Sequence, residues 1–219
     1  MIKAVIFDMD GLMIDSEKIQ SKAFETLISI YKKKPILNTL GIIQTIGMTS
    51  KENWKRLKIK HNIDENLEKL INERRIIYEK LLSSNIKPMP GLIKLLKLLQ
   101  NHNLKMAIAS SSNLNIINLV LSNLQIKKYF QVITSGDEVK RSKPHPEIFL
   151  KTAKKINIDP KDCLVLEDSQ LGVEAAIKAG MKVIAVPNKY TIKHNFSGAD
   201  LIVNSLNENK IINYILLYN

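Results

Sequence analysis

The residues best suited to chemistry stand near the N-terminus, where Asp8 and Asp10 directly follow the short apolar run of residues 2–7. Two carboxylates this close together invite a divalent cation, and a set of oxygen ligands suits Mg²⁺. Gly11 beside them permits a sharp turn at the end of a strand. Because an isolated acidic pair is often only a surface turn or a helix cap, the hypothesis of a site depends on what other segments supply.

A second acidic pair, Glu167 and Asp168, ends the apolar run of residues 163–166. It would complete a metal site with the first pair if both strands end at the same edge of a sheet. Asp168, or the serine that follows it, is equally suited to cap the helix expected from residue 170.

Hydroxyl groups and a lysine follow two further segments. Ser110 and Ser111 come after an apolar run, and their hydroxyls and amides at the start of a helix form a natural phosphate cradle. A plain helix cap is the alternative. Lys143 precedes a rigid turn that begins a helix at Pro146, and a fixed backbone of this kind can aim a charge inward. An isolated lysine is otherwise usually a solvated surface residue.

Alternating apolar runs and helical periods predict a Rossmann-like α/β fold, with a parallel sheet and helices on both faces. The expected strands span residues 2–7, 104–109, 131–134, 163–166, 182–186 and 201–203. The expected helices between them span residues 91–101, 115–124, 146–156 and 170–179. Ligands of such sheets bind beyond the carboxyl ends of the strands. Four strand ends would therefore supply acid, hydroxyl, lysine and acid to one edge.

Residues 16–88 break this alternation, because they show long amphipathic helical periods and no convincing strand. We expect residues 16–88 to form an all-helical domain inserted into an α/β core of residues 1–15 and 89–219. Thr49 and Glu52 are spaced as a capping box that opens the helix carrying Trp54.

Candidate substrate contacts lie near the loop at Gly47. They comprise Gly47, Ser50, Lys51 and Trp54 of the insertion, together with Asn113 of the core. The insertion carries much of the positive charge of the chain, which favours an anionic ligand. The alternatives are a solvated helix face for the lysine and core packing for the tryptophan.

Composition narrows the class of protein. The 219 residues, 45% of them hydrophobic, are enough for a sizeable core, and 33 Lys and Arg against 21 Asp and Glu give a formal net charge of +12. Aromatic residues make up only 5% of the chain, so a base-stacking nucleic-acid module is weakly supported. The single cysteine, Cys163, excludes an internal disulfide. The chain shows neither a membrane-length apolar run nor a signal peptide, so we expect a cytoplasmic protein that does not bind a membrane. We also expect it to be a monomer and not to bind nucleic acid.

The four segments together resemble the haloacid dehalogenase superfamily over essentially the whole chain. The resemblance rests on F-D-M-D-G-L at residues 7–12, A-S-S-S at 109–112, S-K-P-H-P-E-I-F at 142–149 and L-E-D-S-Q-L-G-V-E-A-A-I-K-A-G-M at 166–181. The helical insertion is similar to the cap of the subgroup that contains β-phosphoglucomutase and small-molecule phosphatases. This resemblance implies an enzyme that transfers phosphoryl groups of small phosphorylated metabolites.

The resemblance also implies a role for each residue of the four motifs. Asp8 would be the nucleophile that forms an aspartyl-phosphate, and Asp10 the general acid and base. Bound Mg²⁺ would contact Asp8, the Asp10 carbonyl and Asp168, and Glu167 would hold a metal-bound water. The remaining contacts to the transferring phosphoryl group would come from Ser110, the amide of Ser111 and Lys143. Asp10 argues against a dehalogenase, since a halide leaving group needs no acid.

A phosphatase and a mutase differ in whether water or a sugar hydroxyl accepts the phosphoryl group. Mutases of the subgroup tend to have His at Gln20, Arg near Ser50 and Lys near Asn113, and none of these is matched. The departures favour a phosphatase acting on a sugar phosphate or a nucleoside monophosphate, with β-phosphoglucomutase as the alternative. A receiver domain ranks low because it lacks a helical insertion, and a polyanion-binding protein without catalysis is the remote alternative.

Overall fold

The computed structural model describes residues 1–33 and 50–218, and the chain divides into two compact units. An α/β unit comprises Met1–Asp15 and Lys87–Asn219, and a helical unit comprises Ser16–Ile86. The α/β unit thus resumes slightly before residue 89. Pro88 forms an isolated bridge with Ile14, and the Met89 N–H donates to the Met13 carbonyl at 2.8 Å, which ties this segment to the α/β unit.

The α/β unit is built on a six-stranded parallel sheet in the order β3-β2-β1-β4-β5-β6. Its strands are β1 (Ala4–Phe7), β2 (Lys105–Ala109), β3 (Val132–Thr134), β4 (Cys163–Glu167), β5 (Lys182–Ala185) and β6 (Leu201–Ile202). All six predicted strands are confirmed, with ends within two residues of expectation. The central place of β1, between β2 and β4, brings the segments after these three strands to one edge.

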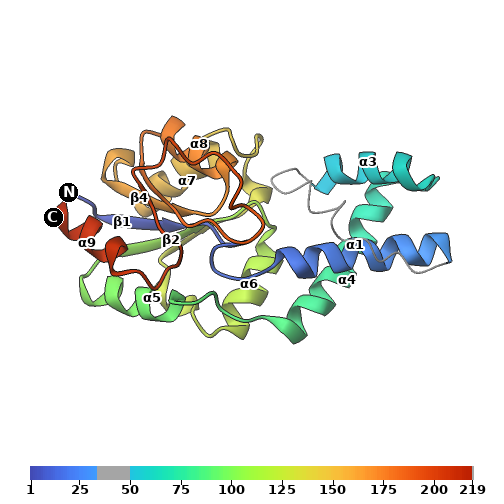
Figure 1. Cartoon of the computed structure of the whole chain (residues 1–219), viewed down its shortest axis with the longest axis horizontal. Coiled ribbons are helices and arrows are strands. Elements are labelled where there is room, and N and C mark those ends of the chain that lie inside the picture. Colours follow the sequence, from blue (N-terminus) through green and yellow to red (C-terminus); the bar gives the residue numbers. More distant parts are fainter. Residues whose placement is uncertain (34–49, 219) are drawn as a thin grey trace. The chain divides into compact units, whose positions relative to one another are not determined.

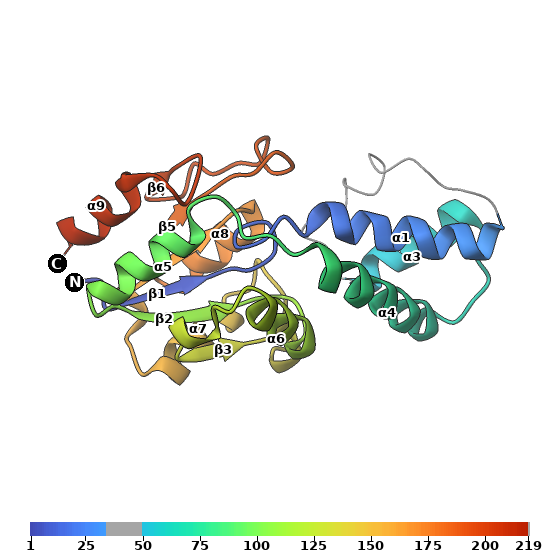
Figure 2. The same cartoon turned by 90° about the horizontal axis from the view of Figure 1, so that it is seen from below.

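Helices cover both faces of this sheet, as the alternating pattern predicts (Figures 1 and 2). α7 (Glu147–Ile156) and α8 (Gln170–Lys178) lie on one side, and α5 (Leu92–Asn101) and α9 (Asn209–Leu217) lie on the other. α6 (Leu114–Asn123) follows β2. Short 3-10 turns at η1 (Lys127–Tyr129), η2 (Gly136–Glu138) and η3 (Pro160–Asp162) complete the connections.

The strands are buried because the sheet is covered on both faces. All four residues of β1 are inaccessible to solvent. Ala4 and Ile6 pack on α7 and α8 in a core that also contains Val165 and Phe149. A strand with two buried faces reads as a continuous apolar run, which is why the sequence signal for β1 is so clear.

The helical unit consists, among its described residues, of α1 (Glu17–Lys32), α3 (Ser50–His61) and α4 (Leu67–Asn85), with no strand. Its core includes Phe24, Trp54 and Leu70. The rings of Phe24 and Trp54 lie 5.2 Å apart between centroids. The side chain of Asn66 caps α4 by accepting from the amides of its first turn. In the described part of the chain, no helix is both long and apolar enough to cross a membrane.

Candidate active site

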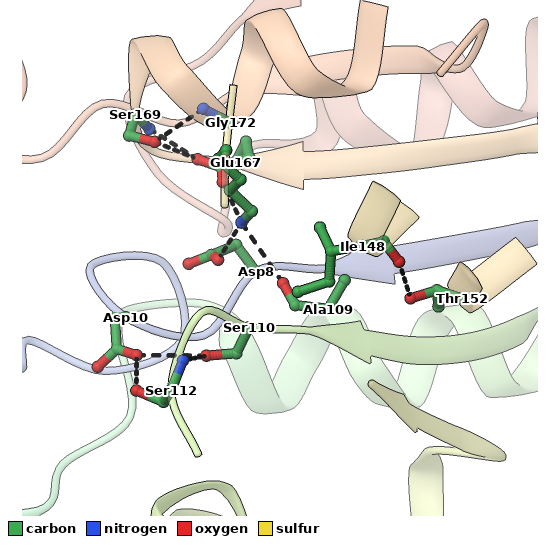
Figure 3. Close-up of polar contacts among 11 residues, drawn as sticks. Asp8, Asp10, Ala109, Ser110, Ser112, Ile148, Thr152, Glu167, Ser169 and Gly172 are labelled. Atoms are coloured by element: carbon green, nitrogen blue, oxygen red, sulfur yellow. Dashed lines mark hydrogen bonds and ion pairs between the residues drawn. The ribbon is translucent and has the colours of Figure 1, made fainter. Parts of the chain in front are cut away.

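The predicted site residues of the α/β unit converge where β1, β2 and β4 end (Figure 3). β1 is followed directly by Asp8, whose side chain is only 8% exposed. Gly11 then turns the chain with a φ of +86°, a conformation that side chains other than glycine rarely adopt. The sequence therefore places acidic residues on a sharp turn at the carboxyl edge of the sheet.

Lys143 joins two of these buried carboxylates. Its Nζ lies 2.6 Å from Oδ1 of Asp8 and 2.6 Å from Oε1 of Glu167. It also donates to the carbonyl of Ala109, at 3.4 Å. The ammonium group thus contacts residues at the ends of β1, β2 and β4, and the prediction that Lys143 points inward is confirmed.

Burial and the contact between Asp8 and Lys143 have opposite effects on the pKa of each of these two groups. Burial raises the pKa of Asp8 to about 8, the Lys143 ammonium opposes the rise, and the charges of Glu167 and Asp10 add to it. Burial alone lowers the pKa of Lys143, but the carboxylates of Asp8 and Glu167 outweigh burial and raise it above its ordinary value. Lys143 stays charged, whereas Asp8 needs further positive charge to be fully ionised at neutral pH.

Glu167 is held by donors on both of its oxygens. Besides Lys143 on Oε1, the amide and the hydroxyl of Ser169 donate to Oε2 at 2.8 and 2.9 Å. The Ser169 hydroxyl also accepts from the Gly172 amide, so the capping role considered for this serine is confirmed. A Cβ on Gly172 would lie 1.8 Å from Oε1, and the glycine therefore makes room for the carboxylate. The contacts in the chain make Glu167 the counter-ion of Lys143, and its link to a metal-bound water stays a prediction.

Asp10 contacts the serine loop after β2. Its Oδ2 accepts from the Ser112 hydroxyl at 2.7 Å and from the Ser110 hydroxyl at 3.4 Å (Figure 3). Ser110 is fully buried, whereas the side chain of Ser111 is exposed. The predicted cradle of hydroxyls and amides is thus adjacent to the predicted general acid.

Asp168 is held by Asn188, a residue that follows β5. Its Oδ2 accepts from Nδ2 of Asn188 at 2.7 Å, and the same amide group donates to the Gly11 carbonyl at 3.1 Å. A Cβ on Gly11 would lie 2.2 Å from this oxygen, so the turn after β1 approaches Asp168 closely only because residue 11 is glycine.

These groups fit a hard divalent cation by their chemistry, since the carboxylates of Asp8 and Asp168 and the neighbouring carbonyls offer oxygen alone. Within residues 1–33 and 50–218, no three His, Cys, Asp or Glu side chains are arranged to hold a metal by themselves. A cation here therefore needs backbone or water ligands as well, in agreement with the predicted use of the Asp10 carbonyl.

Among the candidate substrate contacts outside the central motifs, Trp54 and Asn113 have structural roles in the chain. Trp54 is fully buried in the core of the helical unit, which favours packing over substrate contact. Asn113 caps α6 by accepting from the Ile116 amide at 3.0 Å, so its side chain already has a structural role. Lys51 is exposed and lies 3.8 Å from Glu68.

The remaining predictions for the insertion are limited by what the structure describes. α3 begins at Ser50. Gly47 lies outside the described residues, as does Thr49, which the predicted capping box requires.

Sequence reasoning missed Ser112 and Asn188 as functional candidates. Ser112 stands within the quoted serine run, and the excess of hydroxyls there was the available signal. Asn188 follows β5, whose end lies at the same edge of the sheet as that of β4. A polar residue just after any strand of such a sheet deserves to be considered.

The fold and this site define a family. The chain matches the sequence profile of the haloacid dehalogenase-like hydrolases over residues 5–186 and belongs to that family. It is therefore an enzyme of this hydrolase family, and its relatives include phosphatases.

Individual relatives share most of the chain. A phosphorylated carbohydrates phosphatase from Thermotoga maritima is 33% identical and covers 84% of this chain and 84% of its own length. The structure of β-phosphoglucomutase from Clostridium difficile is 31% identical, with a TM-score of 0.80 over 99% of this chain and 100% of that one. CbbY from Rhodobacter sphaeroides, solved with phosphate, has a TM-score of 0.86 over 95% and 96% of the two chains. At 24% identity, this last likeness shows the fold alone.

Proposed function

We propose that the protein is a Mg²⁺-dependent phosphomonoester hydrolase of small phosphorylated metabolites that works through an aspartyl-phosphate on Asp8. The observation that carries this proposal is the arrangement around Lys143, whose ammonium group lies 2.6 Å from the buried Asp8 carboxylate. Two residues after Asp8, the Asp10 carboxyl group accepts a hydrogen bond from Ser112 of the serine loop. The residues proposed as nucleophile, acid and anion-binding groups thus lie at one edge of the sheet.

In the first step, an oxygen of Asp8 attacks the phosphorus atom while the bond to the leaving oxygen breaks. Asp10 gives its proton to that oxygen, so the product leaves as a neutral alcohol. Lys143, the Ser110 hydroxyl and the Ser111 amide bind the non-bridging oxygens of the phosphoryl group. The ammonium group of Lys143 and the two neutral hydrogen-bond donors stabilise the negative charge that spreads over these oxygens in the transition state.

In the second step, Asp10 takes a proton from water as the water oxygen attacks phosphorus. The bond between phosphorus and Asp8 breaks, inorganic phosphate is released, and Asp8 regains its carboxylate. Asp10 ends the cycle protonated and is ready to act again as the acid. Each step therefore moves one proton through the same carboxyl group.

Asp8, Asp168 and the Asp10 carbonyl would hold the cation. When bound, Mg²⁺ would favour the ionised form of Asp8 and offset the repulsion between this carboxylate and a phosphoryl dianion. This requirement agrees with the raised pKa of Asp8, to about 8, which burial produces and Lys143 alone does not cancel.

The substrate class we infer is a sugar phosphate or a nucleoside monophosphate. The name of the Thermotoga maritima relative supports the former, since it describes a phosphatase of phosphorylated carbohydrates. β-Phosphoglucomutase activity is the second candidate, favoured by the structural likeness to the Clostridium difficile enzyme. Two contacts support the phosphatase instead. Gln20, in place of the mutase histidine, accepts from Arg74 at 2.8 Å, and Asn113 is engaged as a helix cap.

³¹P NMR distinguishes the two activities. The protein is incubated with Mg²⁺, β-glucose 1-phosphate and a trace of glucose 1,6-bisphosphate, and then with a panel of sugar phosphates and nucleoside monophosphates. Inorganic phosphate from one or more of these esters is expected. Glucose 6-phosphate without inorganic phosphate would establish the mutase, and the absence of any turnover across the panel would refute the phosphatase.

A further inference from the structure

The shorter of the two hydrogen bonds that serines donate to Asp10 in Figure 3 comes from a residue that the proposed mechanism does not use. The Ser112 hydroxyl donates to Oδ2 of Asp10 at 2.7 Å, compared with 3.4 Å for the Ser110 hydroxyl. Ser110 also has other work, because it belongs to the proposed phosphate cradle. Ser112 is therefore the better candidate for orienting the Asp10 carboxyl group.

The loop fixes Ser112 from two sides. The Ser112 amide donates to the Ser110 hydroxyl oxygen at 3.0 Å, and the Ser112 carbonyl accepts from the Gly136 amide at 2.9 Å. A Cβ on Gly136 would lie 2.2 Å from the Ser111 carbonyl oxygen, so the segment after β3 packs directly against the serine loop. A hydroxyl carried by a backbone held in this way can impose an orientation on its partner.

A hydroxyl group suits a carboxyl group that changes its protonation state during the reaction. It donates to the carboxylate and can accept from the carboxylic acid, whereas an ammonium group or a backbone amide serves only the ionised form. A serine keeps the carboxyl group oriented in both forms.

We propose, resting on the proposed function, that Ser112 is a positioning residue that holds Asp10 in the orientation needed to protonate the leaving oxygen. The consequence depends on the leaving group. A sugar alcohol is a poor leaving group and needs the proton, whereas p-nitrophenolate leaves without it. A purely structural role, or a role in binding phosphate, would affect both kinds of substrate equally.

The test compares Ser112→Ala, Ser112→Thr and the wild type on p-nitrophenyl phosphate and on the sugar phosphate that the panel shows to be hydrolysed fastest. General acid catalysis contributes about 10²–10⁴-fold to a rate, and we expect loss of its orientation to remove about tenfold of kcat/KM on the sugar phosphate. Less than about a twofold change in kcat/KM is expected on p-nitrophenyl phosphate, since p-nitrophenolate leaves without an acid and kcat/KM does not include the later attack of water, in which Asp10 acts as the base. Ser112→Thr keeps the hydroxyl and is expected to restore activity on the sugar phosphate.

Ser122→Ala is the matched control, because Ser122 is an exposed residue of α6. It should leave both activities unchanged, and circular dichroism establishes that each variant is folded. Equal losses of kcat/KM on the two substrates in Ser112→Ala, or no loss on either, would overturn the positioning role while leaving the phosphatase intact. A wild type inactive on every phosphate ester would overturn the proposed function and this inference with it.

Discussion

Lys143 offers a direct test of how the α/β unit holds its site together, because one buried ammonium group serves two buried carboxylates. Methionine at this position keeps an unbranched side chain near the ring of Phe149, whose centroid lies 5.0 Å from Nζ, but removes the charge. In Lys143→Met, Asp8 and Glu167 each lose an ion pair of 2.6 Å. Breaking a buried ion pair from one side costs ~3–5 kcal/mol, because it leaves an uncompensated charge.

The expected loss in the free energy of unfolding is about 3–5 kcal/mol rather than twice that, because the two carboxylates share one partner and because Asp8, whose pKa burial raises to about 8, can take up a proton. The loss should be larger at about pH 8 than at about pH 6, since protonation of Asp8 at the lower pH removes its uncompensated charge. Adding Glu167→Gln removes one of the two stranded charges and should recover part of the loss.

Urea unfolding can be followed separately in the two units. Trp54, the only tryptophan, reports on the helical unit by fluorescence, and the buried thiol of Cys163 on β4 reports on the α/β unit by its reaction with a disulfide reagent. We expect Lys143→Met to shift the exposure of Cys163 to lower urea. The matched control is Lys178→Met on α8, which removes a surface ion pair of 3.7 Å to Glu174 and should cost less than about 1 kcal/mol. The reasoning is refuted if the two methionine variants unfold alike.

Three further predictions concern other parts of the α/β unit. Gly172→Ala places a Cβ where Oε1 of Glu167 lies, 1.8 Å away, and displacement of that carboxylate should lower kcat at least about tenfold, as steady-state phosphate release will show. Asn188→Ala removes the 2.7 Å donor to Asp168 and should weaken Mg²⁺ binding about 10–100-fold in a calorimetric titration, with no change if Asp168 is not a ligand. Burial raises the pKa of the Cys163 thiol to about 12 from the ordinary 9.0, so the native thiol should resist alkylation at neutral pH. The stability gained from keeping this thiol neutral is fully present below pH 9.0 and is lost as the pH rises through about 12, and a native thiol that reacts as fast as the unfolded one would contradict its burial.

The fold could be predicted almost entirely from the sequence, because the strands are largely apolar runs and β1, β2 and β4 each run directly into polar or acidic residues. β1 is the clearest case, since both of its faces are buried and Asp8 marks its end. The prediction that Asp8 and Glu167 lie at one edge followed from the predicted parallel sheet, and the rigid turn after Lys143 predicted that its charge points inward. Parallel strands bring their carboxyl ends together whatever lies between them in the chain.

The finer contacts of the site could not be predicted, because they join loops that are remote in sequence. Which hydroxyl reaches Asp10 depends on the turn at Ser110, and the donor to Asp168 comes from a loop that follows a different strand. Sequence also leaves the surroundings of a side chain open. Trp54 stands beside a candidate substrate loop in the chain, yet its ring packs on Phe24 in a core.

The central claim, that Asp8 carries the phosphoryl group, is tested most directly by acid quenching of the enzyme during turnover, followed by peptide mass spectrometry. We predict a phosphoryl group on the peptide that contains Asp8 in the wild type. In Asp8→Asn, a folded protein should show neither this modification nor phosphate release. Phosphate release by Asp8→Asn at the wild-type rate, or a phosphoryl group on any other residue, would contradict the account.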